Sequence, residues 1–254
     1  MSSTTHPTEY FFRHAGICPV CEKAVEFIAT GPYFRDQLKC ANCGSLPRHR
    51  ALMKVLSDYF PGWRDLNIHE SSPGWDMLSQ RLARECKTYC ASQYDTSAPN
   101  GTVIDAPRMP CKKYQSENLE EQTYPDDYFD IVIMQDVFEH IFRPNLAIKE
   151  IARTLKPRGA TLMTVPIVMK SRPSQRRAAI SNGNVEYMLE PEFHGNPLGG
   201  GALVTIDWGY DIVAYFHKHS GLSFTMIKID DIDLGIRAKL NEVLVGFKLP
   251  IPSL

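Results

Sequence analysis

The stretch that decides the fold is Tyr124–Pro166, which reads YPDDYFDIVIMQDVFEHIFRPNLAIKEIARTLKPRGATLMTVP. Within it, Phe129–Met134 is a short apolar run of the kind that a buried parallel strand requires. The segment Gln135–His140 follows at the carboxyl end of this strand, where open α/β sheets bind ligands. In Asn145–Leu155 the apolar residues recur on one helical face, and a break that contains glycine then precedes a second strand at Thr161–Val165. The pattern predicts a strand, a helix and a strand in a parallel sheet.

Five short elements of this stretch, in their order, resemble the type 11 branch of the class I S-adenosylmethionine-dependent methyltransferases. The matching elements are Pro125-Asp126, Phe129–Val132, Glu139-His140, Leu155–Pro157 and Gly159. The resemblance implies an α/β fold with a Rossmann-like seven-stranded sheet, a site for S-adenosylmethionine, and methyl transfer as the activity. A strand–helix–strand unit without a catalytic role is the alternative, and the order of the five elements counts against it.

Length and composition describe an ordinary globular protein. The 254 residues are enough for one large domain, or for one medium domain and a small module. A net charge of −1 gives no overall attraction to nucleic acid or to an anionic membrane. No apolar run is long enough to span a bilayer, and the first residues lack the apolar core of a secretory signal. We therefore expect a cytoplasmic protein with no membrane partner, and leave its oligomeric state open.

Four of the seven cysteines are spaced as two metal-binding knuckles. Cys18, Cys21, Cys40 and Cys43 form the pattern C-x2-C-x18-C-x2-C. Four thiolates suit a tetrahedral zinc ion, and such a closed shell leaves no position for a catalytic water. Free thiols and a redox dithiol are the alternatives, but two matched pairs favour one shared site. The sequence predicts a small N-terminal zinc ribbon, whose own apolar core is too small to order it without the metal.

The domain organisation follows from these two signals. We expect a zinc ribbon at 1–47, a connecting helix at 48–62 and a methyltransferase domain at 63–254, with a substrate-side insertion at 167–211. A basic triplet, Arg48-His49-Arg50, lies at the start of the connecting helix. It could contact phosphate, or it could pair with carboxylates of the main domain. The weak basic excess of this part of the chain favours the second interpretation.

The resemblance assigns the methyl-donor site to the turns that follow the strands. The first strand ends in Glu70, and the turn after it holds one glycine where the relatives are richer in glycine. Gln93 or Asp95, after the second strand, would accept hydrogen bonds from the ribose hydroxyls, and Glu117 with Leu119 would flank the adenine. The candidate cofactor-binding residues are Glu70, Ser71, Ser72, Gly74, Gln93, Asp95, Glu117, Asn118, Leu119 and Gln135.

Candidate residues for the chemistry lie after the fourth strand and in the insertion. Asp136 and His140 are one helical turn apart, so both can point toward one pocket, although packing is an equal interpretation for His140. His194 is the best general-base candidate, because it is framed by Gly195 and prolines and histidine titrates near the working pH. A basic stretch opens the insertion and indicates capture of an anionic group, with a solvated surface loop as the alternative. The candidate substrate-binding residues are Arg172, Arg176, Arg177, Asp207 and Trp208.

Three functions are compatible with this sequence. The first is methyl transfer from S-adenosylmethionine to a small metabolite or to a glycan or natural-product intermediate. The second is methylation of ribosomal or transfer RNA, with the ribbon as an RNA-binding module, which the neutral net charge counts against. The third is a non-catalytic binding protein on the same fold, suggested by the single-glycine turn. The sequence favours the first, an enzyme with S-adenosylmethionine and a structural zinc ion.

Overall fold

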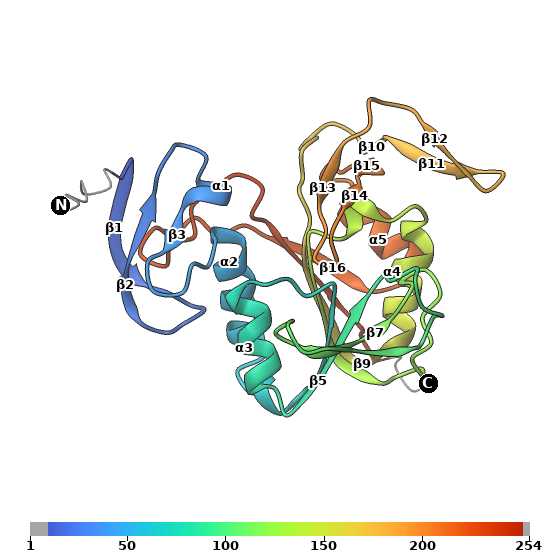
Figure 1. The fold of residues 1–254 in the computed structure, drawn as a ribbon, viewed down its shortest axis with the longest axis horizontal. Coiled ribbons are helices and arrows are strands. Elements are labelled where there is room, and N and C mark those ends of the chain that lie inside the picture. Colours follow the sequence, from blue (N-terminus) through green and yellow to red (C-terminus); the bar gives the residue numbers. More distant parts are fainter. Residues whose placement is uncertain (1–9, 251–254) are drawn as a thin grey trace, which may run out of the picture.

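The computed structural model of the chain describes residues 10–250, and one large mixed sheet forms its centre (Figure 1). The strands of this sheet are β4 (Asn67–Ser71), β5 (Thr88–Gln93), β6 (Val103–Ala106), β7 (Lys112–Ser116), β8 (Phe129–Gln135), β9 (Leu155–Thr164), β16 (Ser223–Ile227) and β17 (Val243–Phe247). Their spatial order is β16-β17-β9-β8-β4-β5-β7-β6. The five strands from β9 to β7 are parallel, whereas β17 and β6 run antiparallel to the neighbours β9 and β7.

The predicted α/β class is confirmed, but the sheet has eight strands and not seven. The additional strand is β6, which pairs antiparallel with β7 at the edge of the sheet. Its four residues alternate between exposed and half-buried, as expected of a short edge strand with one solvated face. So short a segment carries too little apolar periodicity to be recognised from the sequence.

Helices cover both faces of the sheet. They are α2 (Pro47–Tyr59), α3 (Met77–Glu85), α4 (Pro144–Thr154) and α5 (Ile212–Ser220), and η1 (Trp63–Asp65) and η2 (Phe138–His140) are single 3-10 turns. In β8, Ile131 and Ile133 pack in the core beneath α2 and α3, whereas Val132 and Met134 pack in the core beneath α4 and α5. Both faces of β8 are therefore buried, which explains its continuous apolar run. Within residues 10–250, no helix combines the length and the apolarity that crossing a membrane requires.

The N-terminal module is a small sheet joined to the main body by a shared core. It contains β1 (Phe12–Ile17), β2 (Ala24–Ala29), the short helix α1 (Phe34–Gln37) and β3 (Lys39–Cys40). Phe27 of the module packs in the same apolar cluster as Trp63 and Ile236 of the main body. The segment between β16 and β17 returns to the module, where the Ile17 amide donates to the Asp233 carbonyl at 2.8 Å. The predicted domain boundaries stay a prediction, because this core is continuous across them.

The segment between β9 and α5 forms three antiparallel strand pairs at one end of the sheet (Figure 1). The pairs are β10 (Gln175–Arg176) with β15 (Ile206–Asp207), β11 (Ala178–Ser181) with β12 (Asn184–Tyr187), and β13 (Phe193–Gly195) with β14 (Gly201–Leu203). Gly199 and Gly200 have φ of +99° and +72° in the turn between β13 and β14. This left-handed conformation suits glycine.

Candidate active site

A cavity of about 900 Å³ lies at the carboxyl ends of the parallel strands. Its walls come from the ends of β4, β5, β7 and β8 on one side and from the insertion, including β13, on the other. Open α/β sheets bind ligands at this edge, because parallel strands all end there. Volumes of 300–1,000 Å³ are typical of small-molecule sites, so the cavity lies in the upper part of that range.

The turn after β4 forms one wall of the cavity through Ser71, Ser72 and Gly74. The Ser72 amide donates to the Ser92 carbonyl at 2.7 Å, and the Gln93 side chain donates to the Pro73 carbonyl at 2.9 Å. The turn is therefore held against the end of β5 on both sides of its bend. Ser72 takes a φ of +56°, which places a serine in the left-handed conformation where the relatives' turn is glycine-rich.

Glu70 was predicted as a cofactor-binding residue, but it lies beneath the cavity floor and is fully buried. Its carboxylate accepts hydrogen bonds from the Ser79 hydroxyl at 2.7 Å, the Tyr89 hydroxyl at 2.6 Å and the Gln135 amide at 3.1 Å. Burial, together with nearby Asp76, raises the pKa of Glu70 to about 7. The residue thus holds Gln135 and helix α3 in place and does not line the cavity.

The predicted ribose and adenine residues separate into two groups. Gln93, Glu117, Asn118 and Leu119 line the cavity. Asp95 does not, because its carboxylate turns away to accept hydrogen bonds from the Ser97 hydroxyl at 2.6 Å and the Tyr114 hydroxyl at 2.7 Å. These hydrogen bonds lower the pKa of Asp95.

Asp136 lies at the end of β8 and is bound to the N-terminal part of the chain. Its carboxylate pairs with Arg35 of α1 at 2.6 Å and with Arg48 of α2 at 3.2 Å, and it accepts a hydrogen bond from the Thr164 hydroxyl at 2.9 Å. Burial acts to raise the pKa of Asp136, but the two guanidinium groups outweigh it, and the net effect is a lowered pKa. Asp136 is a fixed anion between the two parts of the chain, which does not suit the role of a proton acceptor.

The basic triplet lies within the structure, but of its two arginines only Arg48 makes the predicted pair with a carboxylate of the main domain. Arg48 reaches Asp136, as above, and Arg50 is fully buried, where it donates to the carbonyls of Leu38 at 2.8 Å and Gly235 at 2.7 Å. Because Arg50 has no exposed surface, it is not available to contact phosphate.

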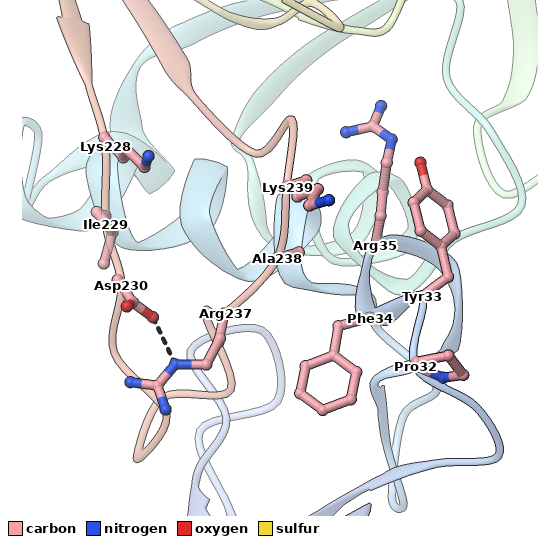
Figure 2. Close-up of a pocket in the computed structure, with 10 residues that line it drawn as sticks. All are labelled: Pro32, Tyr33, Phe34, Arg35, Lys228, Ile229, Asp230, Arg237, Ala238 and Lys239. Carbon is pink, nitrogen blue, oxygen red and sulfur yellow. Dashed lines mark hydrogen bonds and ion pairs between the residues drawn. The ribbon is translucent and has the colours of Figure 1, made fainter. Parts of the chain in front are cut away.

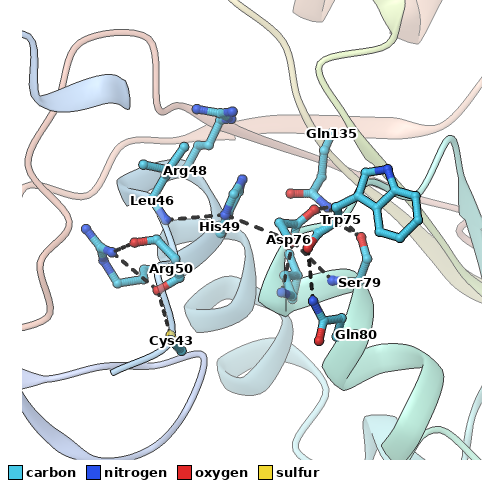
Figure 3. A network of polar contacts seen from close by, with 12 residues as sticks. Cys43, Leu46, Arg48, His49, Arg50, Trp75, Asp76, Ser79, Gln80 and Gln135 are labelled. Atoms are coloured by element: carbon cyan, nitrogen blue, oxygen red, sulfur yellow. Dashed lines mark hydrogen bonds and ion pairs between the residues drawn. The ribbon is translucent and has the colours of Figure 1, made fainter. Parts of the chain in front are cut away.

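Figure 3 shows that polar contacts link the cysteine cluster to the start of α3. The Leu46 amide donates to Nδ1 of His49 at 3.3 Å, and burial lowers the pKa of His49 to about 4. His49 is therefore neutral, and its 4.0 Å approach to Asp76 is a contact and not an ion pair. Asp76 caps α3 by accepting from the Leu78 amide at 2.8 Å.

The four predicted metal ligands meet at one point in the N-terminal module. The Sγ atoms of Cys18, Cys21, Cys40 and Cys43 all lie within 4.8 Å of one another, and the pairs Cys18–Cys43 and Cys21–Cys40 are 3.8 and 3.9 Å apart. Tetrahedral zinc with Zn–S bonds of about 2.3 Å places its sulfur ligands roughly 3.8 Å apart. All four are free thiols without a disulfide, so the cluster has the geometry to hold one metal ion.

The backbone explains this geometry, because both cysteine pairs adopt the same turn. The Glu22 amide donates to the Cys18 carbonyl at 2.7 Å, and the Gly44 amide donates to the Cys40 carbonyl at 2.8 Å. Glu22 and Gly44 follow the second cysteine of their pairs with φ of +58° and +71°. Two equivalent knuckles thus present two sulfur atoms each to the same point.

A second cluster combines Glu139, His140 and His194 on the cavity wall. Oε1 of Glu139 is 3.7 Å from Nε2 of His140 and 3.8 Å from Nδ1 of His194. Burial raises the pKa of Glu139, and the neighbouring Glu139 carboxylate raises the pKa of His194. The structure thus brings His140 and His194 together from β8's end and β13, although 53 residues separate them in the sequence.

Most of the predicted substrate-binding residues are engaged elsewhere. Arg172, Arg176 and Arg177 do not line the cavity. Arg176 donates to the Phe142 carbonyl at 3.0 Å, and Arg177 pairs with Asp207 at 2.8 Å. Asp207 lines the cavity, but its carboxylate is occupied by this pair. The prediction for Trp208 is wrong, because its ring is 2% exposed and packs in the core.

A smaller cavity, of about 350 Å³, lies between α1 and the segment after β16 (Figure 2). Arg35 lies at its edge and also lines the main cavity. Asp230 and Arg237 pair across it at 2.6 Å. This cavity therefore belongs to the junction that positions Arg35 against Asp136.

Comparison with known proteins agrees with the fold. Residues 71–163 match the family model described as a methyltransferase domain. These residues, which run from the end of β4 into β9, therefore contain a methyltransferase domain, as the resemblance to the class I S-adenosylmethionine-dependent methyltransferases predicted. The predicted family is thereby confirmed, and S-adenosylmethionine is the cofactor that the family match supports.

A relative and two solved structures illustrate the similarity. Over 105 residues the chain is 29% identical to a glycine/sarcosine/dimethylglycine N-methyltransferase of Actinopolyspora halophila, covering 41% of this chain and 18% of that protein. The match thus spans less than a fifth of that curated relative. An S-adenosylmethionine-dependent methyltransferase from Mesorhizobium loti aligns with a TM-score of 0.50 and 12% identity over 78% of this chain and 97% of its own. The PH0226 protein from Pyrococcus horikoshii aligns with a TM-score of 0.50 and 14% identity over 80% and 90%. Identities this low show the fold alone.

Several cavity residues were missed by the sequence reasoning. They are Arg35, Asp76, Tyr94, Glu139 and Glu192. Arg35 lies in the N-terminal module, and only the three-dimensional packing brings it to the methyltransferase sheet. Glu139 could have been found, because it belongs to the Glu139-His140 element that carried the family resemblance.

Proposed function

We propose that this chain transfers a methyl group from S-adenosylmethionine to a small-molecule acceptor. The observation that carries the proposal is one continuous cavity between the turn Ser71–Gly74 and the cluster around His194. A donor and an acceptor must share one space for direct transfer, and holding both together supplies much of the rate. The family match covers residues 71–163, which include the strand ends that line one side of this cavity, and so supports the proposal.

The donor end of the cavity is the side formed by the strand ends. Ser71, Ser72 and Gly74 would border the donor closely, while Gln93 and Glu117 offer polar groups farther along the wall. Gly74 leaves room in this turn that a side chain would fill, since an added Cβ would already approach the Asp76 carboxylate at 3.0 Å. S-adenosylmethionine supplies an activated methyl group when bound, so the chain itself has to position the reactants and exclude water.

The acceptor end is the side formed by the insertion. His194, half-buried on β13, and His140 present ring nitrogens there beside Glu139. Such groups can take the proton of an acceptor hydroxyl or amine. The cluster Glu139–His140–His194 supports an acceptor that loses a proton as it is methylated.

We also propose that the four cysteines bind one structural zinc ion. The support is the sulfur geometry, since 3.8 and 3.9 Å separations match a tetrahedral thiolate site. The ion would keep the module folded, and with it Arg35, whose guanidinium holds Asp136 at 2.6 Å. Zinc would thus influence the cavity through the module residues that line it, which are Tyr33, Arg35 and Asp36.

The test uses the full-length chain purified without added metal. Calorimetry with S-adenosylmethionine and with its demethylated product measures the donor site. Incubation with methyl-labelled donor and either a small-metabolite extract or total RNA then shows which fraction takes up the label. Label in small metabolites supports the proposal; label in RNA alone contradicts the acceptor class, and donor binding without any labelled product supports the non-catalytic alternative.

A further inference from the structure

Glu139 is a buried carboxylate without a hydrogen-bond donor. Its residue is 2% exposed, and neither carboxylate oxygen has a hydrogen-bond partner within residues 10–250. The nearest nitrogens, on His140 and His194, are 3.7 and 3.8 Å away, beyond hydrogen-bond distance. Leaving a buried charged acceptor unsatisfied costs several kcal/mol, so a native protein normally supplies a partner.

The orientation of His140 shows that the neutral ring cannot donate a hydrogen bond to Glu139. Nδ1 of His140 lies 2.9 Å from the Leu203 carbonyl, which can only accept, so Nδ1 carries the hydrogen. In the neutral ring, Nε2 then presents a lone pair toward Oε1 of Glu139. A lone pair and a carboxylate that face each other repel unless a proton or a metal ion lies between them, and 3.7 Å is too long for a shared proton but suits two ligands of one ion. Metal-binding histidines are held in this way, with the second nitrogen donating to a backbone carbonyl.

Hydrogen bonds and ring packing hold the residues of this cluster in place. Thr205 donates its backbone amide to the Glu139 carbonyl at 2.7 Å, and Nε1 of Trp208 donates to the Phe138 carbonyl at 3.2 Å. The ring of His194 meets that of His140 edge to face, with centroids 5.0 Å apart. Glu139, His140 and His194 are therefore preorganised, as a binding site for an ion requires.

We propose that Glu139, His140 and His194 bind a divalent transition-metal ion at the acceptor end of the cavity. The three potential ligand atoms lie within 4.8 Å of one another. Ligands at about 2.1 Å from one ion are roughly 3.0 to 3.4 Å apart, so the observed 3.7 and 3.8 Å need only a small contraction. Two imidazoles and one carboxylate suit zinc, iron, cobalt or manganese better than magnesium.

Three protein ligands leave coordination positions open toward the cavity. Catalytic metal sites keep such positions for water or substrate, in contrast to the closed shell of four thiolates. The open positions assign the acceptor to compounds with a hydroxyl beside a second oxygen, such as diols, catechols or hydroxy acids. This assignment rests on the proposed function. Such a pair of oxygens can bind one ion together, and the ion lowers the pKa of a bound hydroxyl so that its proton passes to water. With the ion bound, the two histidines and Glu139 act as ligands and no longer as the proton acceptor.

The test uses the 254-residue chain loaded with one equivalent of zinc, which fills the four-cysteine site and leaves the second site free, and records the visible absorption spectrum as Co²⁺ is added. We expect one equivalent of Co²⁺ to bind with ligand-field bands but without the intense thiolate-to-cobalt bands that exchange into the cysteine site would produce. Soft thiolate ligands in tetrahedral S4 geometry select zinc, so the cysteine site is expected to keep its zinc when Co²⁺ is added. Addition of catechol as a probe with two adjacent oxygens should shift the bands.

Substitution of the proposed metal ligands tests whether each of them binds the ion. Glu139→Gln and His194→Ala should each raise the dissociation constant for Co²⁺ more than about 100-fold, above the 10- to 100-fold cost of losing an outer partner. The matched controls are Glu186→Gln on the exposed strand β12 and His219→Ala on α5, and both should bind Co²⁺ as the unchanged chain does. His194 is half-buried on a hairpin, so His194→Ala remains informative even where Glu139→Gln does not fold.

Unchanged Co²⁺ affinity in His194→Ala, or binding only with thiolate bands, would overturn the metal site and leave Glu139 and His194 as an acid–base pair. A catechol without effect on the bands would overturn the assigned acceptor class. Calorimetry with S-adenosylmethionine separates the two proposals. Donor binding without Co²⁺ binding refutes only the metal, and Co²⁺ binding without donor binding refutes only the proposed function.

Discussion

Glu70→Gln should remove a large part of the pH dependence of folding stability. Glu70 is fully buried, and its pKa is raised from 4.5 to about 7 by burial and by Asp76. The folded chain therefore holds this proton more tightly than the unfolded chain does. The free energy of unfolding must then fall as the pH rises from about 4.5 to about 7, and it stays lowered at higher pH.

The magnitude follows from the shift of about 2.5 pKa units, the difference between about 7 and 4.5. At about 1.36 kcal/mol per unit, the full effect is about 3.4 kcal/mol, of which about 2.5 kcal/mol falls between pH 5 and pH 8. Glutamine has nearly the same shape and does not ionise, so the variant lacks this contribution. Its amide can still meet the Ser79 and Tyr89 hydroxyls, which contact the carboxylate at 2.7 and 2.6 Å.

The assay is urea unfolding at a series of pH values for the unchanged chain, for Glu70→Gln and for the control Glu186→Gln, whose side chain is exposed on β12. The stability of the unchanged chain should fall by about 2.5 kcal/mol more than that of Glu70→Gln between pH 5 and pH 8. The control should follow the unchanged chain. Parallel pH profiles for Glu70→Gln and the unchanged chain would refute the reasoning, since Glu70 would then titrate as an exposed carboxyl does.

Three further changes test other parts of the structure. Cys40→Ser should abolish the expected single equivalent of zinc and lower the melting temperature, and a full equivalent retained in the variant would contradict the cysteine site. Arg35→Met should destabilise folding by roughly 2 to 3 kcal/mol, less than a fully buried pair because Arg48 still faces Asp136, whereas Arg13→Met in the exposed pair with Glu26 should leave urea unfolding unchanged. Gly74→Val should raise the dissociation constant of S-adenosylmethionine at least about tenfold by calorimetry, because even a Cβ already meets Asp76 at 3.0 Å, and unchanged affinity would place the donor elsewhere.

The sequence predicted the parts of the fold that depend on local patterns. The continuous apolar run of β8 required burial on both faces, and the structure places Ile131 and Val132 in two different cores. The spacing of the four cysteines likewise depends on two short turns, which is why it could be recognised in the chain. The edge strand β6 escaped because its four residues have one exposed face and little periodicity.

The candidate site was less predictable, because it depends on contacts between distant segments. Asp136 was expected to act on the reacting groups. Its carboxylate instead forms an ion pair with Arg35, which lies 101 residues away in the sequence. The basic residues of the insertion suggested an anion site, yet Arg177 is paired with Asp207 within the same insertion. Exposure and pairing of a charged side chain are tertiary properties, so composition alone does not reveal which charges remain free.

The most direct test of the central claim is calorimetry of the full-length chain with S-adenosylmethionine. The cavity at the strand ends predicts one donor molecule bound per chain with a dissociation constant on the order of micromolar, and weaker binding in Gly74→Val. Absence of heat at millimolar donor, in protein shown to be folded by circular dichroism, would contradict the account.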